Sequence, residues 1–304
     1  MAPSKSFRWA GEQHDWDGDY LSPAVRAVMQ TGVNDARSSG WMTGLPHGVP
    51  LEVTVVKPTA RLRPDEARRW IDDVTRIVSV VDDACTRRRA PARPASLSIT
   101  VYLWHGRKRL PEQAGARLTP DDCNSGLCVH HTEDGSRRIM VFRSEDAHKT
   151  VIHEVLHAYE VGSWCNRDAA ILENVAEMGR AVDLRSTVEV RPAESVVDAL
   201  AIIIYSGMYA RDWAGLLRRC DAGRRRALHH FRGAPWAQDT HAFEYLVVRH
   251  ALLTRREAFE AAFDSGLQAP RRGAVRAALR AQDVAALVSV GKGRVAGTSL
   301  SPTT

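Results

Sequence analysis

From Ser144 onward the apolar residues of the chain recur at one spacing, which differs from the spacing just before it. This change limits the folds that the sequence can adopt. Before it, the apolar residues Leu97, Ile99 and Val101 alternate with polar ones, which is typical of a half-buried strand. After it, apolar residues recur at helical spacing up to about residue 290. We therefore predict an α+β fold, in which a small antiparallel or mixed sheet precedes a mostly helical C-terminal half.

Turn and cap signals divide these two halves further. Pro64 is suited to open a helix, and Asp134-Gly135 between two alternating runs predicts a β-hairpin. The expected strands are 51–57, 97–103, 127–131 and 138–142, and the expected later helices are 144–161, 166–183, 193–208, 212–220, 240–263 and 271–290. The predicted organisation is an irregular N-terminal arm (1–50), an α/β subdomain (51–162), a helical subdomain (163–290) and a disordered tail (291–304).

Composition narrows the classes of protein to consider. With 304 residues, of which 44% are hydrophobic, the chain can bury a large core. Its 42 basic residues exceed its 36 acidic ones, but only five are lysines, so the surplus gives nucleic-acid binding little support and leaves it open. Five scattered cysteines and the lack of an apolar signal or membrane-spanning run predict a soluble, intracellular protein without a membrane partner.

The segment from Val151 to His157 contains a His-Glu-x-x-His motif within a predicted helix. Residues four apart lie on one helical face, so His153 and His157 can offer both imidazoles to one tetrahedral Zn²⁺. Glu154 follows the first ligand, about 100° further round the helix, where its carboxylate can take a proton from water. We expect Glu154 to be the general base of a hydrolytic reaction.

A hydrolytic zinc usually takes a third protein ligand. Glu173 in the next predicted helix is our first choice, and Glu177, four residues later, can orient a ligand imidazole. The pair Glu194 and Asp198 repeats this spacing and is the fallback for the third ligand. The prediction is one zinc per chain, held by His153, His157 and Glu173.

At these residues the sequence resembles the gluzincin metallopeptidases. Their pattern is His-Glu-x-x-His on one helix, a glutamate ligand on the next and an acid four residues after it, and His153, Glu154, His157, Glu173 and Glu177 each match. Asn174 stands where compact gluzincins carry glycine, which leaves Glu177 open as the ligand. The resemblance implies a zincin-like fold and a zinc-dependent hydrolase whose substrate is a peptide or protein.

Three further segments resemble the uncharacterised metallopeptidases of large double-stranded DNA viruses. They are Asn124-Ser125-Gly126, Phe142-Arg143-Ser144-Glu145 and the run from Thr240 to Tyr245, and the similarity covers about residues 97 to 255. The gluzincin resemblance also implies that the strand 138–142 is an edge that pairs with substrate. It implies a donor for the tetrahedral intermediate too, for which Tyr245 is the first choice and His241 the second.

Other readings stay open. Cys123 and Cys128 with His130 and His131 have residue types that suit a structural zinc, although packing in the hairpin explains the cysteines better. A non-catalytic structural or virion protein that keeps a zincin fold is the alternative function. A basic protein associated with nucleic acid, in which the motif is incidental, is a further alternative.

Overall fold

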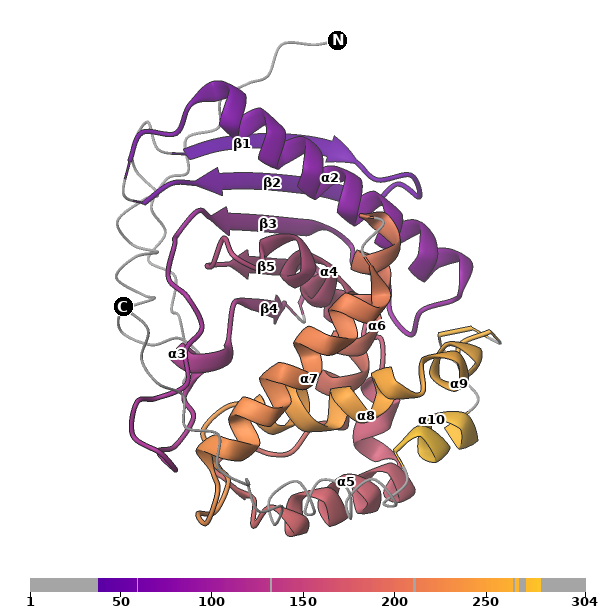
Figure 1. Cartoon of the computed structure of the whole chain (residues 1–304). Helices are drawn as coiled ribbons and strands as arrows, with labels where there is room; N and C mark the ends of the chain where they lie inside the picture. Colours follow the sequence, from indigo (N-terminus) through magenta and orange to yellow (C-terminus); the bar gives the residue numbers. More distant parts are fainter. Residues whose placement is uncertain are drawn as a thin grey trace.

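A computed structural model describes residues 38–279 apart from 59, 132, 210–211, 265 and 268–271. The larger part of the predicted N-terminal arm, with Trp9 and Trp16, lies outside the described residues, as do the end of the last predicted helix and the predicted tail 291–304. The described chain is a mixed α/β structure, in which a five-stranded sheet is followed by helices (Figure 1). The α+β class is thus confirmed at this coarse level.

The sheet has the order β1-β2-β3-β5-β4 and combines both pairing directions. β2 to β3 and β3 to β5 are parallel, whereas β1 to β2 and β4 to β5 are antiparallel. The strands are β1 (Ser38–Gly44), β2 (Pro50–Val56), β3 (Leu97–Tyr102), β4 (Gly126–His130) and β5 (Arg137–Val141). As predicted, β4 and β5 form a hairpin, at whose turn Asp134 Oδ1 accepts a hydrogen bond from Ser136 N at 2.8 Å.

Alternation along the strands separates the two faces of the sheet. Val53, Ile99 and Ile139 are fully buried, and they belong to the main core that the helices α2 (Pro64–Arg87) and α4 (Ala147–Ala158) complete. In Figure 1 both helices lie over the same face of the sheet. The opposite face carries a smaller apolar cluster with Tyr102 and Phe142. The packing of α4 on the sheet therefore holds the His-Glu-x-x-His helix rigidly.

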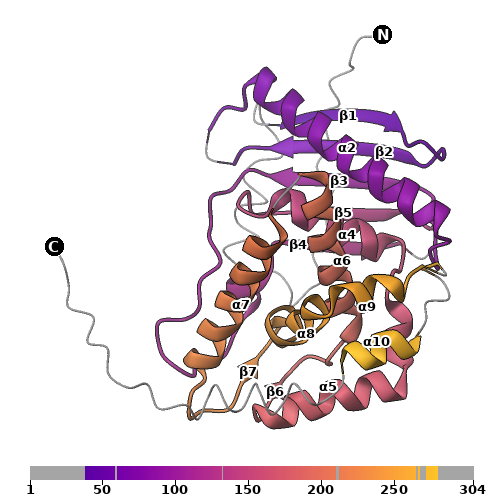
Figure 2. The same cartoon turned by 45° about the vertical axis from the view of Figure 1, so that its right-hand side comes forward.

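The C-terminal half is a group of helices below the sheet in Figures 1 and 2. Its central member is α6 (Pro192–Met208), which packs against α4 and α8 and is buried on most sides. The remaining segments are η1 (Ser163–Arg167), α5 (Ala169–Ala181), α7 (Trp213–His230), η2 (Glu244–Val248), α8 (Arg249–Thr254), α9 (Arg256–Ala261), α10 (Arg272–Ala278) and the short strands β6 (Arg185–Ser186) and β7 (Ala237–Gln238). No helix in the described ranges has both the length and the apolar character that a bilayer span requires.

Three expectations about local structure are wrong. The segment 38–44, assigned to the irregular arm, is strand β1; its Ser- and Gly-rich sequence lacks alternation, and main-chain pairing with β2 holds it. The strand at 138–142 is not an edge, because β5 lies between β3 and β4 and the edge position falls to β4. The helix expected over 240–263 is instead divided into a π-helical segment and two short α-helices, which meet at Arg255.

Candidate metal centre

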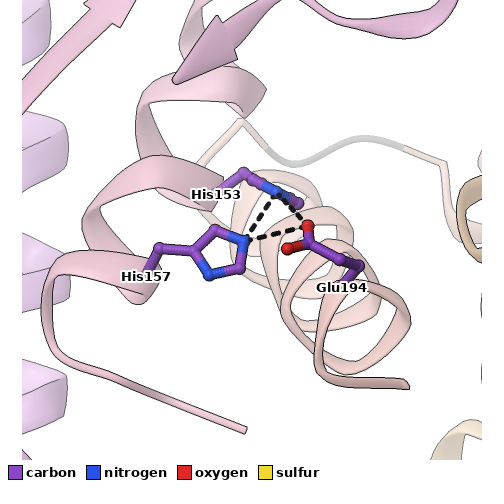
Figure 3. A group of neighbouring side chains, drawn as sticks. All are labelled: His153, His157 and Glu194. Atoms are coloured by element: carbon purple, nitrogen blue, oxygen red, sulfur yellow. Dashed lines mark hydrogen bonds and ion pairs between the residues drawn. The ribbon is translucent and has the colours of Figure 1, made fainter. Parts of the chain in front are cut away.

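The motif helix α4 presents its polar face to the N-terminal turn of α6. Val151, Ile152 and Val155 are fully buried in the core, and this anchors α4 with His153 and His157 on its other side. Pro192 occupies the first turn of α6, where its missing N–H costs no helical hydrogen bond. Two residues later Glu194 projects toward the imidazoles, as Figure 3 shows.

Three donor atoms from the two helices meet at this point. His157 Nε2 lies 3.1 Å from His153 Nε2 and 3.1 Å from Glu194 Oε2. His153 Nε2 lies 3.5 Å from the same carboxylate oxygen. In a tetrahedral zinc site with bonds of about 2.0–2.2 Å, neighbouring donors are roughly 3.3–3.6 Å apart. The triangle drawn in Figure 3 therefore already has nearly the size that a zinc ion requires.

The electrostatics of the cluster also suit a cation. Burial lowers the pKa of His153, but contacts with Asp198 and Glu194 outweigh this and raise it to about 9. Burial raises the pKa of Glu194, yet the two imidazoles beside it hold that pKa well below the usual range of a carboxyl. A carboxylate that stays ionised among groups that favour positive charge is the chemistry of a dication site.

Asp198, one turn along α6 from Glu194, contacts the far side of the first imidazole. Its Oδ1 lies 3.3 Å from His153 Nδ1, close enough for an ion pair although the alignment is not that of a good hydrogen bond. Lys149 donates to Asp198 at 2.7 Å, and Arg249 forms a second ion pair with it. These two cations compensate the burial of Asp198 and keep its pKa well below the usual value. Asp198 is thereby placed to set the orientation of the His153 ring.

Glu154 lies beside the cluster, at the inner end of a cleft. Its side chain is buried, and burial raises its pKa although His153 and His157 act in the opposite direction. A raised pKa suits a group that must accept and release a proton. The cleft has a volume of about 840 Å³, and its lining includes His153, Glu154, Asp198 and Tyr245.

Gly126, the first residue of β4, packs directly against Glu154, and both residues line the cleft. A Cβ at this position would lie 2.5 Å from Thr150 Cγ2 and 2.8 Å from Glu154 Oε1, so a larger residue would displace the carboxylate. In the sequence, the segment Asn124-Ser125-Gly126 stands out only through a resemblance. A glycine beside a buried carboxylate could not be identified without the distance between β4 and α4.

Tyr245 joins the cluster from η2, a π-helical segment. Its hydroxyl donates to Glu194 Oε2 at 3.0 Å, and its ring centroid is 5.8 Å from that of His153. Burial and the nearby Glu194 raise the pKa of Tyr245 well above its usual value, so the hydroxyl stays protonated and can donate. The wider turn of a π-helix is frequent at functional sites.

The structure places His241 in a neighbouring network and not in the cluster. Its Nδ1 lies 3.0 Å from Glu244 Oε1, and the fully buried Glu244 also accepts from Arg191 N at 2.9 Å. Burial lowers the pKa of His241, but its contact with Glu244 outweighs this and raises it. The ring centroid of His241 is 6.4 Å from that of Tyr245, so His241 supports the segment from which Tyr245 projects.

Glu173 and Glu177 are far from the imidazoles, which corrects the predicted ligand set. The side chain of Glu173 is 68% exposed and accepts a hydrogen bond from Arg180 Nη2 at 2.7 Å. Helix α5 buries Ile171 and Val175 instead, so both glutamates lie on its solvent face. Glu194, the fallback, occupies the position expected of Glu173, and Asp198 occupies that expected of Glu177.

Within the described residues, the group His153, His157 and Glu194 is the one set of three or more side chains with donor atoms close enough to share a metal ion. The alternative zinc site in the hairpin is therefore not assembled: Cys123 and Cys128 are free thiols, and burial raises the pKa of both.

No protein-family model matches the chain. A search of curated proteins also finds no significant relative.

Proposed function

We propose that this chain is a zinc-dependent peptidase of the gluzincin type, with His153, His157 and Glu194 as the protein ligands. The observation that carries the proposal is the set of distances of 3.1, 3.1 and 3.5 Å among the three donor atoms, which come from two helices. With Glu194 in place of Glu173, the ligand comes from α6 and not from the next α-helix, α5, but the acid four residues after the ligand is kept as Asp198. A zincin-like fold is part of the same proposal.

Zinc in this position would supply a Lewis acid that polarises the substrate carbonyl and lowers the pKa of water. Glu154, buried next to the ligands, would accept a proton from the attacking water and pass it to the leaving amine. Tyr245 would donate its hydroxyl hydrogen bond to the oxygen on which negative charge develops. Asp198 would keep the ring of His153 in the orientation that ligation requires.

The edge strand β4 would bind the substrate backbone. It is the outermost strand of the sheet, and its first residue, Gly126, lines the cleft beside Glu154. An extended peptide can add to such an edge by main-chain hydrogen bonds, which are independent of sequence. The role expected of the strand 138–142 thus passes to β4, whose glycine lets the strand backbone lie close to the general base.

Metal content and activity together test the proposal. Purified protein is expected to hold about one zinc per chain, and His153→Ala should lose it. Glu154→Gln should keep the zinc and abolish cleavage of a peptide library, since the amide cannot act as a base. The exposed Glu173→Gln is the matched control and should change neither quantity.

Two outcomes would contradict the proposal. Zinc that binds with the expected stoichiometry to a wild-type protein that cleaves no peptide would favour the non-catalytic, structural alternative. Zinc that is retained after His153→Ala would show that the metal binds elsewhere.

A further inference from the structure

One wall of the cleft is a face of α7. The lining includes Leu216, Arg219, Cys220, Gly223 and Arg226; apart from the neighbours Arg219 and Cys220, successive positions are three or four residues apart, which is the spacing of one helical face. Gly223 lies between the two arginines, and a Cβ there would be 3.8 Å from Leu246 Cδ2, another residue of the lining. Arg219 and Arg226 therefore line the same cleft as Glu154.

A second segment of the lining also contributes cations. Lys108 and Arg109, from the segment between β3 and α3 (Pro120–Cys123), line the cleft. Lys108 pairs with Asp146 at 3.2 Å, whereas the exposed Arg109 forms no ion pair with any described residue. Arg219 and Arg226 of α7 share this lack of an ion-pair partner among the described residues.

The carboxylates that line the cleft have other contacts. Asp198 is held by Lys149 and Arg249, and Asp146 by Lys108. Glu145 accepts from the main chain of Lys108, and Asp122 accepts from Thr119. No carboxylate of the described chain pairs with Arg109, Arg219 or Arg226, which we call the rim arginines.

Other arginines of α7 behave differently. Arg218 pairs with Asp212 at 3.4 Å, and Arg225 pairs with Asp221 at 2.5 Å. Both lie on the helix outside the cleft lining. Unpaired positive charge on α7 is therefore concentrated where the helix faces the site, and general surface charge does not explain this distribution.

We propose that the cleft selects peptides with acidic side chains, which the rim arginines bind; the cleavage of such peptides rests on the peptidase function proposed above. Seven residues of helix separate Arg219 from Arg226 by about 10 Å. Flexible arginines at that distance can reach two carboxylates on one face of an extended peptide, where alternate side chains are about 6.7 Å apart. Arg109, which lines the same cleft, adds a third guanidinium group for such a peptide.

A peptide fits the cleft better than nucleic acid does. The edge strand β4 begins in the cleft and can pair with a peptide backbone, which a nucleic acid cannot imitate. Isolated guanidinium groups are suited to discrete carboxylates, with which they form paired hydrogen bonds.

Binding to the full-length Glu154→Gln protein tests the selectivity without cleavage. The probes are two fluorescein-labelled ten-residue peptides, one with alternating glutamates and the other with glutamine at the same positions. At low salt we expect the acidic peptide to bind about tenfold more tightly, and added salt should reduce this ratio. The double substitution Arg219→Gln and Arg226→Gln should lower the ratio to about twofold.

The matched control removes the same charge from the same helix. Arg218→Gln with Arg225→Gln should leave the binding ratio unchanged. An equal loss in this control would overturn the inference, because any charge on α7 would then serve. Equal binding of both peptides would overturn it too, as would an oligonucleotide that binds more tightly than the acidic peptide through Arg219 and Arg226.

Cleavage by the wild-type protein separates this inference from the proposed function. If peptides are cleaved with equal kcat/KM whether acidic or neutral, the inference fails and the peptidase function stands. If no peptide is cleaved but the acidic one binds through Arg219 and Arg226, the peptidase function fails and the cleft remains a site for acidic peptides.

Discussion

Helices α5 and α6 carry the same arrangement of acids but use it in opposite ways. In α5, Glu173 and Glu177 are four residues apart and exposed; in α6, Glu194 and Asp198 have the same spacing and are enclosed. The side chain of Asp198 is 3% exposed, and that of Glu173 is 68% exposed. Burying a carboxylate is costly unless cations compensate it, so the buried pair indicates a functional requirement that the exposed pair lacks.

The largest effect is expected from removing one carboxylate from each helix. Glu194→Ala takes away the proposed third ligand and should lower zinc affinity by more than roughly 100-fold, beyond the loss typical of outer partners. Glu173→Ala should have no effect, because its carboxylate contacts only the exposed Arg180 within the described chain. Competition with a zinc-binding dye measures both affinities, and equal losses would break the contrast between α5 and α6.

Substitution of the second acid of each pair, Asp198 in α6 or Glu177 in α5, should give a smaller difference in zinc affinity. Asp198→Asn leaves Lys149 and Arg249 without their carboxylate and releases the ring of His153. We expect zinc affinity to fall about 10- to 100-fold and the free energy of unfolding to fall by roughly 3 kcal/mol. Urea denaturation and zinc competition measure the two losses. Glu177→Gln on α5 is the control, and a similar destabilisation there would count against the account.

A substitution at Tyr245 tests whether the site around Glu194 and Asp198 contributes to catalysis as well as to metal binding. Tyr245→Phe removes the hydroxyl that donates to Glu194 but keeps the ring against His153. We expect kcat to fall about 100-fold, as for other donors that stabilise a developing oxyanion, while the zinc content stays near one per chain. Unchanged kcat would assign the hydroxyl to the positioning of Glu194 alone.

The smallest effect is expected at the start of α5, where Asp168 contributes to the stability of the fold and not to the metal site. Asp168 caps this helix by accepting from Ile171 N at 3.2 Å, and its hydrogen bonds with Arg276 lower its pKa below 3.8. A lowered pKa in the folded state adds stability above about pH 4, and this is lost as the pH falls through the folded value. Asp168→Asn should cost about 1 kcal/mol at pH 7, because the amide can still cap the helix but loses the ion pair with Arg276. The difference from wild type, measured by urea denaturation, should shrink below pH 4; a constant difference would contradict this.

The motif helix and the strand pattern could be predicted because both follow from local periodicity. His153, Glu154 and His157 share one helix, so their spacing alone brings them together. The third ligand could not be chosen in this way, since Glu173 and Glu194 begin identical spacings. Only the packing of α6 against α4 decides between them, and that contact joins segments far apart in the chain.

Strand order was beyond local analysis for the same reason. The alternation in 138–142 predicts a strand but not its neighbours, and the hairpin places β4 outside β5. β1 has no apolar alternation at all, so only its pairing with β2 reveals it. In the sequence the rim arginines likewise count only toward the general surplus of basic residues, because a sequence does not show which charges lack a partner.

The most direct test of the central claim is the position of the metal in crystals of the zinc-loaded protein, measured by anomalous scattering at the zinc edge. We predict one strong peak at about 2.0–2.2 Å from the Nε2 atoms of His153 and His157 and from the carboxylate of Glu194. A peak beside Glu173, or no peak between α4 and α6, would contradict the account.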